Sequence, residues 1–399
     1  MITVNDINFS GKRAVVRVDF NVPINARFEV TDNTRIAAAI PTIKKIISDG
    51  GSVVLMSHLG RPKKEAPGAF PVKFSLKNIV SELSGLLGIE VKFTEDCISD
   101  KAFSMSSSLK AGEVLLLENL RYYKEEEVGD KVFAQKLSAH GDVYVNDAFG
   151  TAHRAHASTA IITDFFTDAK ASGLLMSSEV SSLELVLSNY KKPFTAIVGG
   201  AKVSSKISII SHLLDKIDNL IIGGGMAYTF FKAQGGQVGN SLVEDDYLDE
   251  ARKILKKAVK KGVRVILPTD SICADSFSNE AAQKIFNTKD ILSGWMGMDI
   301  GPKAIKSCKV CIEESQTILW NGPMGVFEMS SFAEGTKQIA YSIVTATERG
   351  AYSLVGGGDS VAAINQLRLK EHVSYVSTGG GAMLEYLEGK ELPGVAALK

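Results

Sequence analysis

The chain has 399 residues, and because single domains usually contain about 100–200 residues, two domains of similar size are expected. Lys and Arg together equal Asp and Glu, at 45 each, so the net charge gives no reason to expect nucleic acid or an anionic membrane as a partner. Met1–Arg17 has no signal-peptide pattern, and no apolar run approaches the ~20 residues that a membrane span needs. With four cysteines in the chain, these features predict a reducing, cytoplasmic location.

Short apolar runs rich in β-branched residues alternate with amphipathic stretches along the chain. The runs predict strands at Ala14–Val18, Ser52–Met56, Glu113–Leu117, Asp142–Val145, Phe194–Val198, Asn219–Ile222, Val263–Leu267, Thr317–Trp320 and Tyr352–Val355. Many of these are continuously apolar, as strands covered on both faces are. Thr34–Ser48 and Asp246–Lys261 have the apolar spacing of helices, and Gly262 ends the second. This alternation predicts an α/β fold with parallel sheets.

The pattern restarts near the middle of the chain. Ser177–Asn189 has helical spacing, and Lys191-Lys192-Pro193 then leads into a new apolar strand. We therefore expect a domain boundary in or beside this helix.

Cys308 and Cys311 form an isolated CxxC pair. A zinc site would need a second such pair or nearby histidines, and the surrounding sequence has neither. Because Ser307–Ile312 alternates like a strand, we interpret the pair as two ordinary thiols of a strand.

Arginine and histidine side chains follow several predicted strands of the first half. Arg17–Pro23 reads RVDFNVP, Met56–Pro62 reads MSHLGRP, Glu118–Arg121 reads ENLR, and Asn146–Arg154 ends in His-Arg, while Arg35 lies at the start of a helix. The carboxyl ends of parallel strands meet at one edge of a sheet, where ligands bind. An isolated arginine is usually a solvated surface charge, and an isolated histidine usually caps a turn. Several guanidinium groups at one edge instead predict a site for a small, multiply charged anion.

Four glycine turns follow strands of the second half, at Gly199-Gly200, Gly223–Gly225, Gly356–Gly358 and Gly379–Gly381. The first continues to Lys202 and Lys206, which are four residues apart and are expected on one face at a helix start. Neither a Walker A motif nor GxGxxG is present. One glycine turn alone is often only a tight turn, but four after strands predict a nucleotide platform.

Asp359 follows the third glycine turn. A carboxylate there is placed to hold Mg²⁺, which prefers oxygen ligands and phosphate partners. The alternative is that Asp359 caps a helix that begins near Ser360.

These segments occur in motifs that together resemble the phosphoglycerate kinase family. The first half contains RVDFNVP at Arg17–Pro23, SHLGRP at Ser57–Pro62, LENLR at Leu117–Arg121 and GTAHRAHAS at Gly150–Ser158. The second half contains GGAKVSSKI at Gly199–Ile207, WNGPMGVFE at Trp320–Glu328, GGGDS at Gly356–Ser360 and STGGGA at Ser377–Ala382. The motifs occur in family order over nearly the whole chain, and the ordered set is highly specific.

The resemblance implies two similar Rossmann-like domains with parallel sheets that face each other across a cleft and are joined by a hinge helix. Residues 1–173 would bind 3-phosphoglycerate or 1,3-bisphosphoglycerate, and 174–189 would form the hinge. Residues 190–387 would bind MgADP or MgATP, and 388–399 would return to the N-terminal domain. The implied activity is reversible phosphoryl transfer between 1,3-bisphosphoglycerate and ADP, by a monomer.

The resemblance also implies individual residues. The substrate site would be formed by Asp19, Phe20, Asn21, Arg35, His58, Leu59, Gly60, Arg61, Arg121 and Arg154. The nucleotide site would be formed by Lys206, Gly297, Glu328, Gly357, Gly358, Asp359 and Ser360. Glu328 would hold the ribose and Asp359 the Mg²⁺. The catalytic groups facing the migrating phosphoryl group would be Arg35, Lys202 and Gly379–Gly381, with Gly380 at the centre.

Both nucleophiles of this reaction, an ADP oxygen and a carboxylate, are already ionised at neutral pH, so no general base is needed. Transfer between two domains predicts hinge closure. One alternative is a nucleotide-dependent dehydrogenase, which the missing GxGxxG disfavours. Another is a bilobal protein that binds phosphorylated metabolites, which leaves Lys202, Lys206 and Asp359 unexplained. A structural or nucleic-acid role is the weakest alternative because the net charge is zero.

Overall fold

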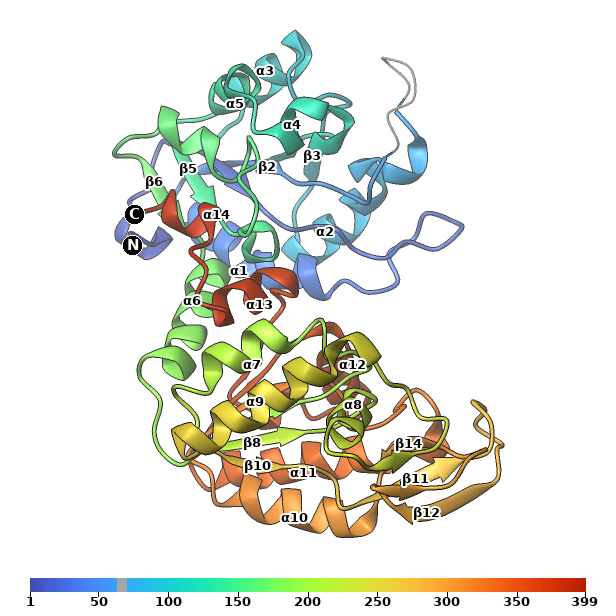
Figure 1. Cartoon of the computed structure of the whole chain (residues 1–399). Helices are drawn as coiled ribbons and strands as arrows, with labels where there is room; N and C mark the ends of the chain where they lie inside the picture. Colours follow the sequence, from blue (N-terminus) through green and yellow to red (C-terminus); the bar gives the residue numbers. More distant parts are fainter. Residues whose placement is uncertain (63–69) are drawn as a thin grey trace. The chain divides into compact units, whose positions relative to one another are not determined.

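The chain forms two compact units in the computed structural model, which describes residues 1–62 and 70–399 (Figure 1). Unit 1 comprises Met1–Val180 and Glu391–Lys399, and unit 2 comprises Ser181–Lys390. The boundary falls within helix α6 (Leu174–Leu187), which therefore begins in unit 1 and ends in unit 2. Within the described ranges, no helix has the length and apolar character needed to cross a bilayer.

Unit 1 is built on a six-stranded parallel sheet in the order β3-β4-β2-β1-β5-β6. Its strands are β1 (Arg13–Arg17), β2 (Ser52–Met56), β3 (Val91–Phe93), β4 (Val114–Leu116), β5 (Val143–Asn146) and β6 (Lys170–Ser172). The four strands predicted for this half are present, with ends that differ by one residue at most. The edge strands β3 and β6 were not predicted, because each has only three residues.

Helices cover the sheet of unit 1. They are α1 (Thr34–Ser48), α2 (Val80–Leu87), α3 (Asp100–Ser107), α4 (Lys124–Val128), α5 (Lys131–Ser138) and α14 (Pro393–Ala396). Ile36 and Ile43 of α1 pack in one apolar core with Val16 of β1 and Leu55 of β2. Alternate residues of a strand point to opposite faces, so this core lies on the face of the sheet that α1 and α2 cover (Figure 1).

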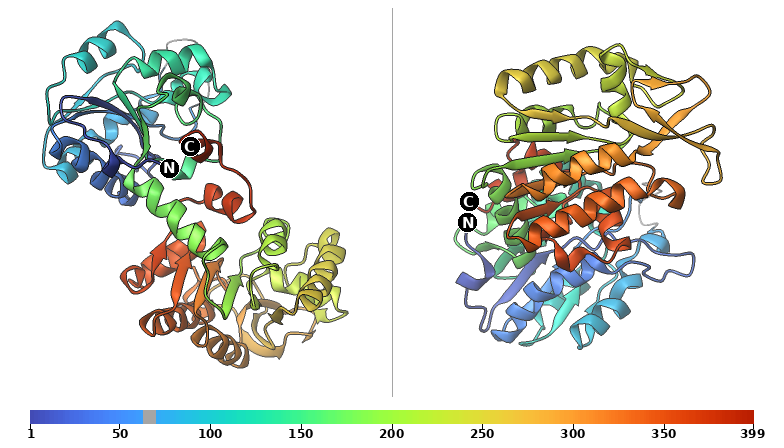
Figure 2. Two further views of the ribbon diagram at one scale, coloured as in Figure 1. Left: turned by 90° about the vertical axis from the view of Figure 1, so that its left-hand side faces the viewer. Right: turned by 90° about the horizontal axis from the view of Figure 1, so that it is seen from below.

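The last residues of the chain are attached to the rest of unit 1 by hydrogen bonds to their main chain. Gly394 N donates to Ala152 O over 2.8 Å. Lys170 Nζ donates to Ala397 O, also over 2.8 Å. The chain therefore begins and ends in the same unit (Figure 2).

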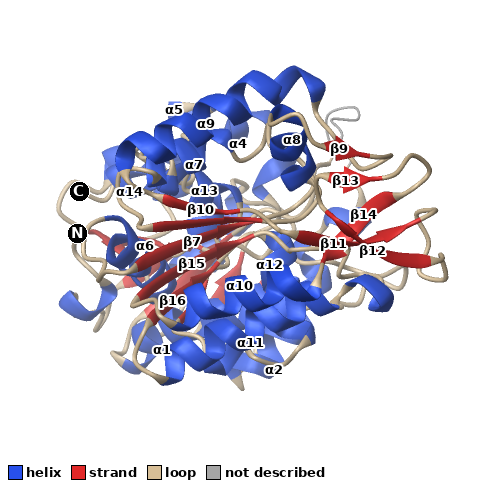
Figure 3. Ribbon diagram, turned by 60° about the horizontal axis from the view of Figure 1, so that its bottom comes forward, coloured by secondary structure: helices blue, strands red, loops and turns tan. Residues whose placement is uncertain are grey.

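Unit 2 has a second six-stranded parallel sheet, in the order β10-β8-β7-β15-β16-β17. Its strands are β7 (Phe194–Val198), β8 (Asn219–Ile222), β10 (Arg264–Ile266), β15 (Thr317–Asn321), β16 (Tyr352–Val355) and β17 (Tyr375–Val376). Its helices are α7 (Ile207–Leu213), α8 (Met226–Ala233), α9 (Leu248–Lys261), α10 (Pro302–Glu313), α11 (Glu334–Glu348), α12 (Gly358–Gln366) and α13 (Gly381–Leu387). Helices α7 and α9 cover one face of this sheet, and α10 and α11 cover the other (Figures 1 and 3).

Unit 2 also contains two small sheets that were not predicted (Figure 3). One is antiparallel, in the order β12 (Gln283–Asn287), β11 (Asp270–Ala274) and β14 (Met296–Ile300). The other pairs β9 (Gln237–Val238) with β13 (Asp290–Ile291). These strands are short, and β12 is mostly exposed, so the sequence carries little hydrophobic signal for them.

The predicted strand at Ser307–Ile312 is wrong, because these residues lie in helix α10. Cys308 and Cys311 face the core of unit 2 together with Ala304 and Ile312. This spacing of four, three and one is helical, and six residues were too few to distinguish it from alternation. Both thiols are free and buried, so their interpretation as ordinary thiols is consistent with the structure.

In both large sheets the order in which strands are added reverses beside the first strand. β1 lies between β2 and β5, and β7 lies between β8 and β15. In open parallel sheets, ligands bind outside the carboxyl ends of strands at such switch points. The residues that follow β1, β5, β7 and β15 are therefore the first place to look for a site.

Candidate functional site

A buried ionic network follows β1 in unit 1. The Arg17 side chain is 1% exposed; its Nε donates to Ser158 Oγ over 2.8 Å, and its Nη2 lies 3.9 Å from Glu126 Oε1. The same Nη2 lies 3.3 Å from His58 Nδ1. The network therefore joins the end of β1 to the loop after β2 and to the GTAHRAHAS segment.

Arg35 reaches across from α1 to the segment after β1. Its Nη1 donates to Asp19 Oδ2 over 2.9 Å and to the Asn21 carbonyl over 3.3 Å. Asp19 Oδ1 lies 3.9 Å from His58 Nδ1. Phe20, between them, is a core residue whose side chain is fully buried, and its backbone N–H donates to Ser57 Oγ.

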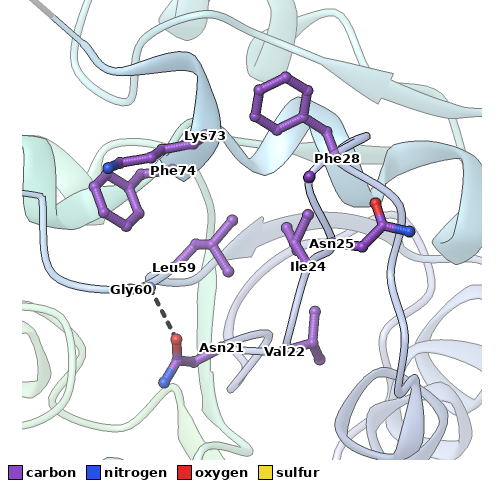
Figure 4. Close-up of a pocket in the computed structure, with 10 residues that line it drawn as sticks. Asn21, Val22, Ile24, Asn25, Phe28, Leu59, Gly60, Lys73 and Phe74 are labelled. Carbon is purple, nitrogen blue, oxygen red and sulfur yellow. Dashed lines mark hydrogen bonds between the residues drawn. The ribbon is translucent and has the colours of Figure 1, made fainter.

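The turn at Gly60 is bonded from two sides. Gly60 N donates to Asn21 Oδ1 over 2.8 Å (Figure 4), and Arg121 Nη1 donates to Gly60 O over 2.8 Å. Gly60 has φ +62°, and a Cβ there would lie 2.6 Å from the Phe74 ring, so this turn requires glycine. A cavity of about 360 Å³ adjoins the turn and is lined partly by Leu59 and Phe28 (Figure 4).

The electrostatics of these residues show that the cations lie close together. Burial, followed by the charges of Arg17, Arg121 and Arg35, holds the pKa of His58 well below its usual range. Burial and then Arg17, Arg121 and Arg154 lower the pKa of His156 to about 3. Both imidazoles are therefore neutral at pH 7. The guanidinium groups make this edge a suitable site for a polyanion.

In unit 2, a cavity of about 540 Å³ lies where the glycine turns converge. Gly200, Gly224 and Gly225 line it from the turns after β7 and β8, and Gly297, Glu328 and Asp359 also line it. Much of the remaining wall is apolar and is formed by Tyr228, Leu242, Phe277, Met296, Met298, Met324, Val326 and Met329. An apolar pocket with a few charged groups at its rim suits a nucleotide.

The glycines allow backbone segments to approach closely in this cavity. A Cβ at Gly199 would overlap Pro323 O, and one at Gly224 would lie 2.5 Å from Gly200 N. A Cβ at Gly297 would overlap the Tyr228 hydroxyl. Side chains at these positions would therefore fill the cavity or push its walls apart.

Lys206 is tied to the turn after β16 through Asn321. Lys206 Nζ donates to Asn321 Oδ1, and Asn321 Nδ2 donates to Gly356 O over 2.9 Å. Burial lowers the pKa of Lys206, and the charge of Asp359 acts in the opposite direction, so the two side chains are electrostatic neighbours. Gly322 N donates to Ser360 Oγ over 2.6 Å, which joins the ends of β15 and β16.

The chain matches the family model described as phosphoglycerate kinase over residues 4–390. A phosphoglycerate kinase of Porphyromonas gingivalis is 54% identical, with both chains covered completely. A cytosolic phosphoglycerate kinase of Nicotiana tabacum is 51% identical, over 99% of this chain and 97% of the relative. The solved structure of phosphoglycerate kinase from Coxiella burnetii is 40% identical, has a TM-score of 0.90, and is matched over 100% of this chain and 98% of that one.

The chain belongs to the phosphoglycerate kinase family. The resemblance seen in the sequence motifs is thereby confirmed. The expected α/β class with parallel sheets is confirmed as well, and the structural match to a family member extends over the whole chain.

The residues that the family resemblance implied differ in their surroundings. Asp19, Asn21, Arg35, His58, Gly60 and Arg121 are joined by contacts within unit 1, while Gly297, Glu328 and Asp359 line one cavity of unit 2. Arg154 Nε donates to His153 Nε2 over 3.2 Å. Arg61 is exposed, and only Pro62 follows it in the first described range, residues 1–62. Gly380, with φ +50°, immediately precedes α13.

One local prediction and one alternative interpretation for the nucleotide half of this phosphoglycerate kinase family member are wrong. Lys202 and Lys206 do not share the first turn of a helix, because α7 begins at Ile207 and Lys202 lies in the exposed loop before it. Asp359 does not cap α12, since Gly357 holds the N-cap position and the helix has no side-chain cap bond. The Asp359 carboxylate is thus not used by the helix end.

The described residues contain no group of three or more His, Cys, Asp or Glu side chains that could enclose a metal ion. Mg²⁺ is commonly held by one or two carboxylates together with substrate phosphates and water, so such a cage is not required. Asp359 supplies a carboxylate at the cavity wall and therefore fits a magnesium–nucleotide complex.

Three residues that join parts of these sites were not among the candidates: Arg17, Asn119 and Asn321. Asn119 and Asn321 each lie at or after a strand end, which is the signal that could have identified them. Asn119 bonds Leu59, which is 60 residues away in sequence, and Asn321 bonds Gly356 and Lys206, which are 35 and 115 residues away, so no local pattern reveals these contacts.

Proposed function

We propose that unit 1 holds the phosphoglycerate and unit 2 holds the magnesium–adenine nucleotide. The chain is an enzyme of the phosphoglycerate kinase family, and its reaction is reversible phosphoryl transfer from 1,3-bisphosphoglycerate to ADP, giving 3-phosphoglycerate and ATP. The observation that carries the assignment to the units is the pair of unlike sites, a cationic cluster in one unit and a glycine-lined apolar cavity in the other.

The phosphoglycerate is proposed to bind at the carboxyl edge of the unit 1 sheet. The proposed ligands are Asp19, Phe20, Asn21, Arg35, His58, Leu59, Gly60, Arg61, Arg121 and Arg154. The substrate carries a phosphate and a carboxylate or acyl phosphate, and forked guanidinium donors match both. The neutral imidazole of His58 supplies hydrogen bonding without adding charge.

The nucleotide is proposed to bind with its base in the apolar cavity of unit 2 and its phosphates at the glycine turns. The proposed ligands are Lys206, Gly297, Glu328 (for the ribose), Gly357, Gly358, Asp359 and Ser360. Asp359 would hold Mg²⁺, which neutralises phosphate charge. Glycine turns let backbone N–H groups approach phosphate oxygens closely.

The chemistry needs positioning and charge stabilisation rather than a general base. The carboxylate of 3-phosphoglycerate and the terminal oxygen of ADP are both ionised at pH 7. Arg35 and Lys202, with the backbone at Gly380, are proposed to stabilise the negative charge of the transferring phosphoryl group. Aligning the reactants can lower the barrier by about 7–11 kcal/mol.

Direct transfer requires the phosphoglycerate and the nucleotide to meet. Because they are assigned to different units, the reactive state is proposed to form by closure, with α6 as the hinge element. We also propose that the enzyme acts as a monomer in the cytoplasm.

A coupled assay tests the proposed function. The purified chain is mixed with MgATP and 3-phosphoglycerate, and the acyl phosphate is trapped with excess glyceraldehyde-3-phosphate dehydrogenase and NADH. Loss of NADH absorbance that requires every component supports the proposal, and a Lys202→Ala variant excludes a contaminating kinase. No loss of absorbance, from folded protein that binds both ligands, would contradict it.

A further inference from the structure

Asn119, which follows β4, uses all the hydrogen-bonding capacity of its side chain. Nδ2 donates to Leu59 O over 2.8 Å and to Phe74 O over 2.9 Å. Oδ1 accepts from Leu59 N over 3.2 Å and from Arg121 N over 3.0 Å. The side chain is fully buried. A flipped amide would place donors against two N–H groups, so the network permits one orientation.

The two bonds to Leu59 fix the peptide groups on both sides of this residue. The next residue, Gly60, donates to Asn21 Oδ1 (Figure 4) and accepts from Arg121 Nη1. Asn119 therefore sets the position of the Gly60 turn at its base, while Arg121 and Asn21 contact the same turn. A shift of Leu59 would move Gly60, to which the proposed substrate ligands Asn21 and Arg121 are both hydrogen-bonded.

The contact with Phe74 holds the same turn from outside. The Phe74 ring lies against Gly60, where a Cβ would approach it to 2.6 Å. The neighbouring Glu118 accepts from Leu76 N over 2.8 Å and from Ser75 Oγ over 2.5 Å. Glu118 and Asn119 thus anchor the segment that packs on the turn.

A buried asparagine can contribute to stability alone, because replacing it leaves its buried hydrogen-bond partners unsatisfied, which is costly. Here, however, the partners of Asn119 include Arg121 itself and the residue before Gly60. We propose that Asn119 is a positioning residue for the phosphoglycerate. It holds the Gly60 turn and the Arg121 backbone in register, so that the Arg121 donors engaged by neither Gly60 O, at 2.8 Å, nor Glu127 Oε1, at 3.4 Å, face the anion. This inference rests on the proposed function of unit 1.

The test compares Asn119→Asp and Asn119→Leu with the wild-type chain. Aspartate keeps acceptors for Leu59 N and Arg121 N but loses both donated bonds, and leucine loses all four. The matched control is His140→Leu, because His140 is also fully buried in unit 1 and bonds Ser106 Oγ and Cys97 O at 2.9 Å each. It contacts none of the proposed ligands through these bonds.

Steady-state kinetics and calorimetric binding of 3-phosphoglycerate are measured with each variant, together with the thermal midpoint. For both Asn119 variants, the KM for 3-phosphoglycerate is expected to rise at least tenfold, with the KM for MgATP changed less than twofold. The calorimetric Kd for 3-phosphoglycerate should rise by a similar factor. His140→Leu should lower the thermal midpoint and leave both KM values within twofold.

The inference is overturned if the folded Asn119 variants keep the wild-type KM for 3-phosphoglycerate and lose only thermal stability, as the control does. Failure of both variants to fold would identify Asn119 as a residue of the folding core and would overturn it as well. An inactive wild-type chain would instead contradict the proposed function, so the two failures are distinguishable.

Discussion

The guanidinium of Arg35 donates to the carboxylate of Asp19 over 2.9 Å, and the same Nη1 atom also reaches the Asn21 carbonyl. The Arg35 side chain is 38% exposed, whereas that of Asp19 is 10% exposed. Among the described residues, hydrogen-bond partners are present for Nη1 only, so the rest of the planar fork is available for a ligand. Asp19 therefore orients Arg35 without consuming its other donors.

Replacement of Arg35 by lysine tests this arrangement. An ammonium group can still pair with Asp19, but it cannot keep that bond and also present a planar fork. We expect kcat to fall by about 10²-fold or more, and stability to change by less than about 1 kcal/mol because the side chain is partly exposed. Coupled-assay kinetics and urea unfolding measure the two effects.

The matched control is Arg13→Lys, at the opposite end of β1, where Arg13 lies 3.7 Å from Asp142. This variant should keep the wild-type kcat. Near-normal turnover of Arg35→Lys would exclude a special role for the guanidinium.

Lys206→Met tests the assigned nucleotide site. The change removes the ammonium group that bonds Asn321 and leaves the Asn321 carbonyl oxygen without that donor. In the proposed function the ammonium group also bonds the nucleotide. A hydrogen bond to a charged group contributes about 1.5–3 kcal/mol, so the KM for MgATP should rise about tenfold or more. The KM for 3-phosphoglycerate should stay within about twofold, because no bond of unit 1 changes.

Lys253→Met is the control for this variant. Lys253 is exposed on α9 and pairs with Glu250 in the same helix. Its removal should leave both KM values unchanged. If the Lys206→Met variant instead raised only the KM for 3-phosphoglycerate, the assignment of the nucleotide to unit 2 would be wrong.

The sequence was most informative where strands are buried on both faces. β2, β7, β8 and β16 have the predicted ends, because a continuous apolar run stops where the chain leaves the sheet. β12 is mostly exposed and pairs through its backbone, so its side chains form no continuous apolar run. Pairing of this kind depends on residues distant in the sequence.

Some residues of the candidate sites could be predicted from the sequence and others could not. Arginines and glycines after strands could be predicted, since parallel strands deliver their carboxyl ends to one edge. Asn119 could not, because an asparagine after a strand is equally typical of a turn, and its bond to Leu59 spans 60 residues. The positions of Lys202 and Asp359 relative to their helices also depended on where each helix begins, which local spacing predicts poorly.

Gly297→Ala tests whether nucleotide binding depends on the close contact between Gly297 and Tyr228 in the cavity wall. A methyl group at this position would overlap the hydroxyl of Tyr228, which is buried and donates to Ser271 Oγ over 3.1 Å. The tyrosine must move into the cavity or lose its bond, so the KM for MgATP should rise about tenfold. The double variant Gly297→Ala/Tyr228→Ala removes the overlap and should recover part of the affinity.

Gly85→Ala is the matched control, since Gly85 lies in α2 with no atom within 4 Å of the added Cβ. It should keep the wild-type KM and stabilise the helix by about 0.5–1 kcal/mol. An unchanged KM for MgATP in Gly297→Ala would show that the nucleotide does not depend on this wall.

Asp147 predicts a dependence of stability on pH. The side chain is fully buried after β5, and Oδ1 accepts from Met176 N of α6 over 3.1 Å. Burial raises the pKa of Asp147 to about 6. The folded state therefore keeps a proton that the unfolded state releases above pH ~4, so this residue lowers stability as the pH rises from about 4 to 6.

Asp147→Asn removes this titration. The free energy of unfolding of the variant, relative to wild type, should increase by up to about 3 kcal/mol from pH 4 to 6 and stay constant above. Urea unfolding at half-unit pH steps measures the difference, and Asp246→Asn, at an exposed position in unit 2, is the control that should show no such change. The constant offset between the proteins reports the fit of the amide to Met176 N and does not affect the slope. A difference independent of pH would mean that Asp147 ionises in the folded state as readily as in the unfolded chain.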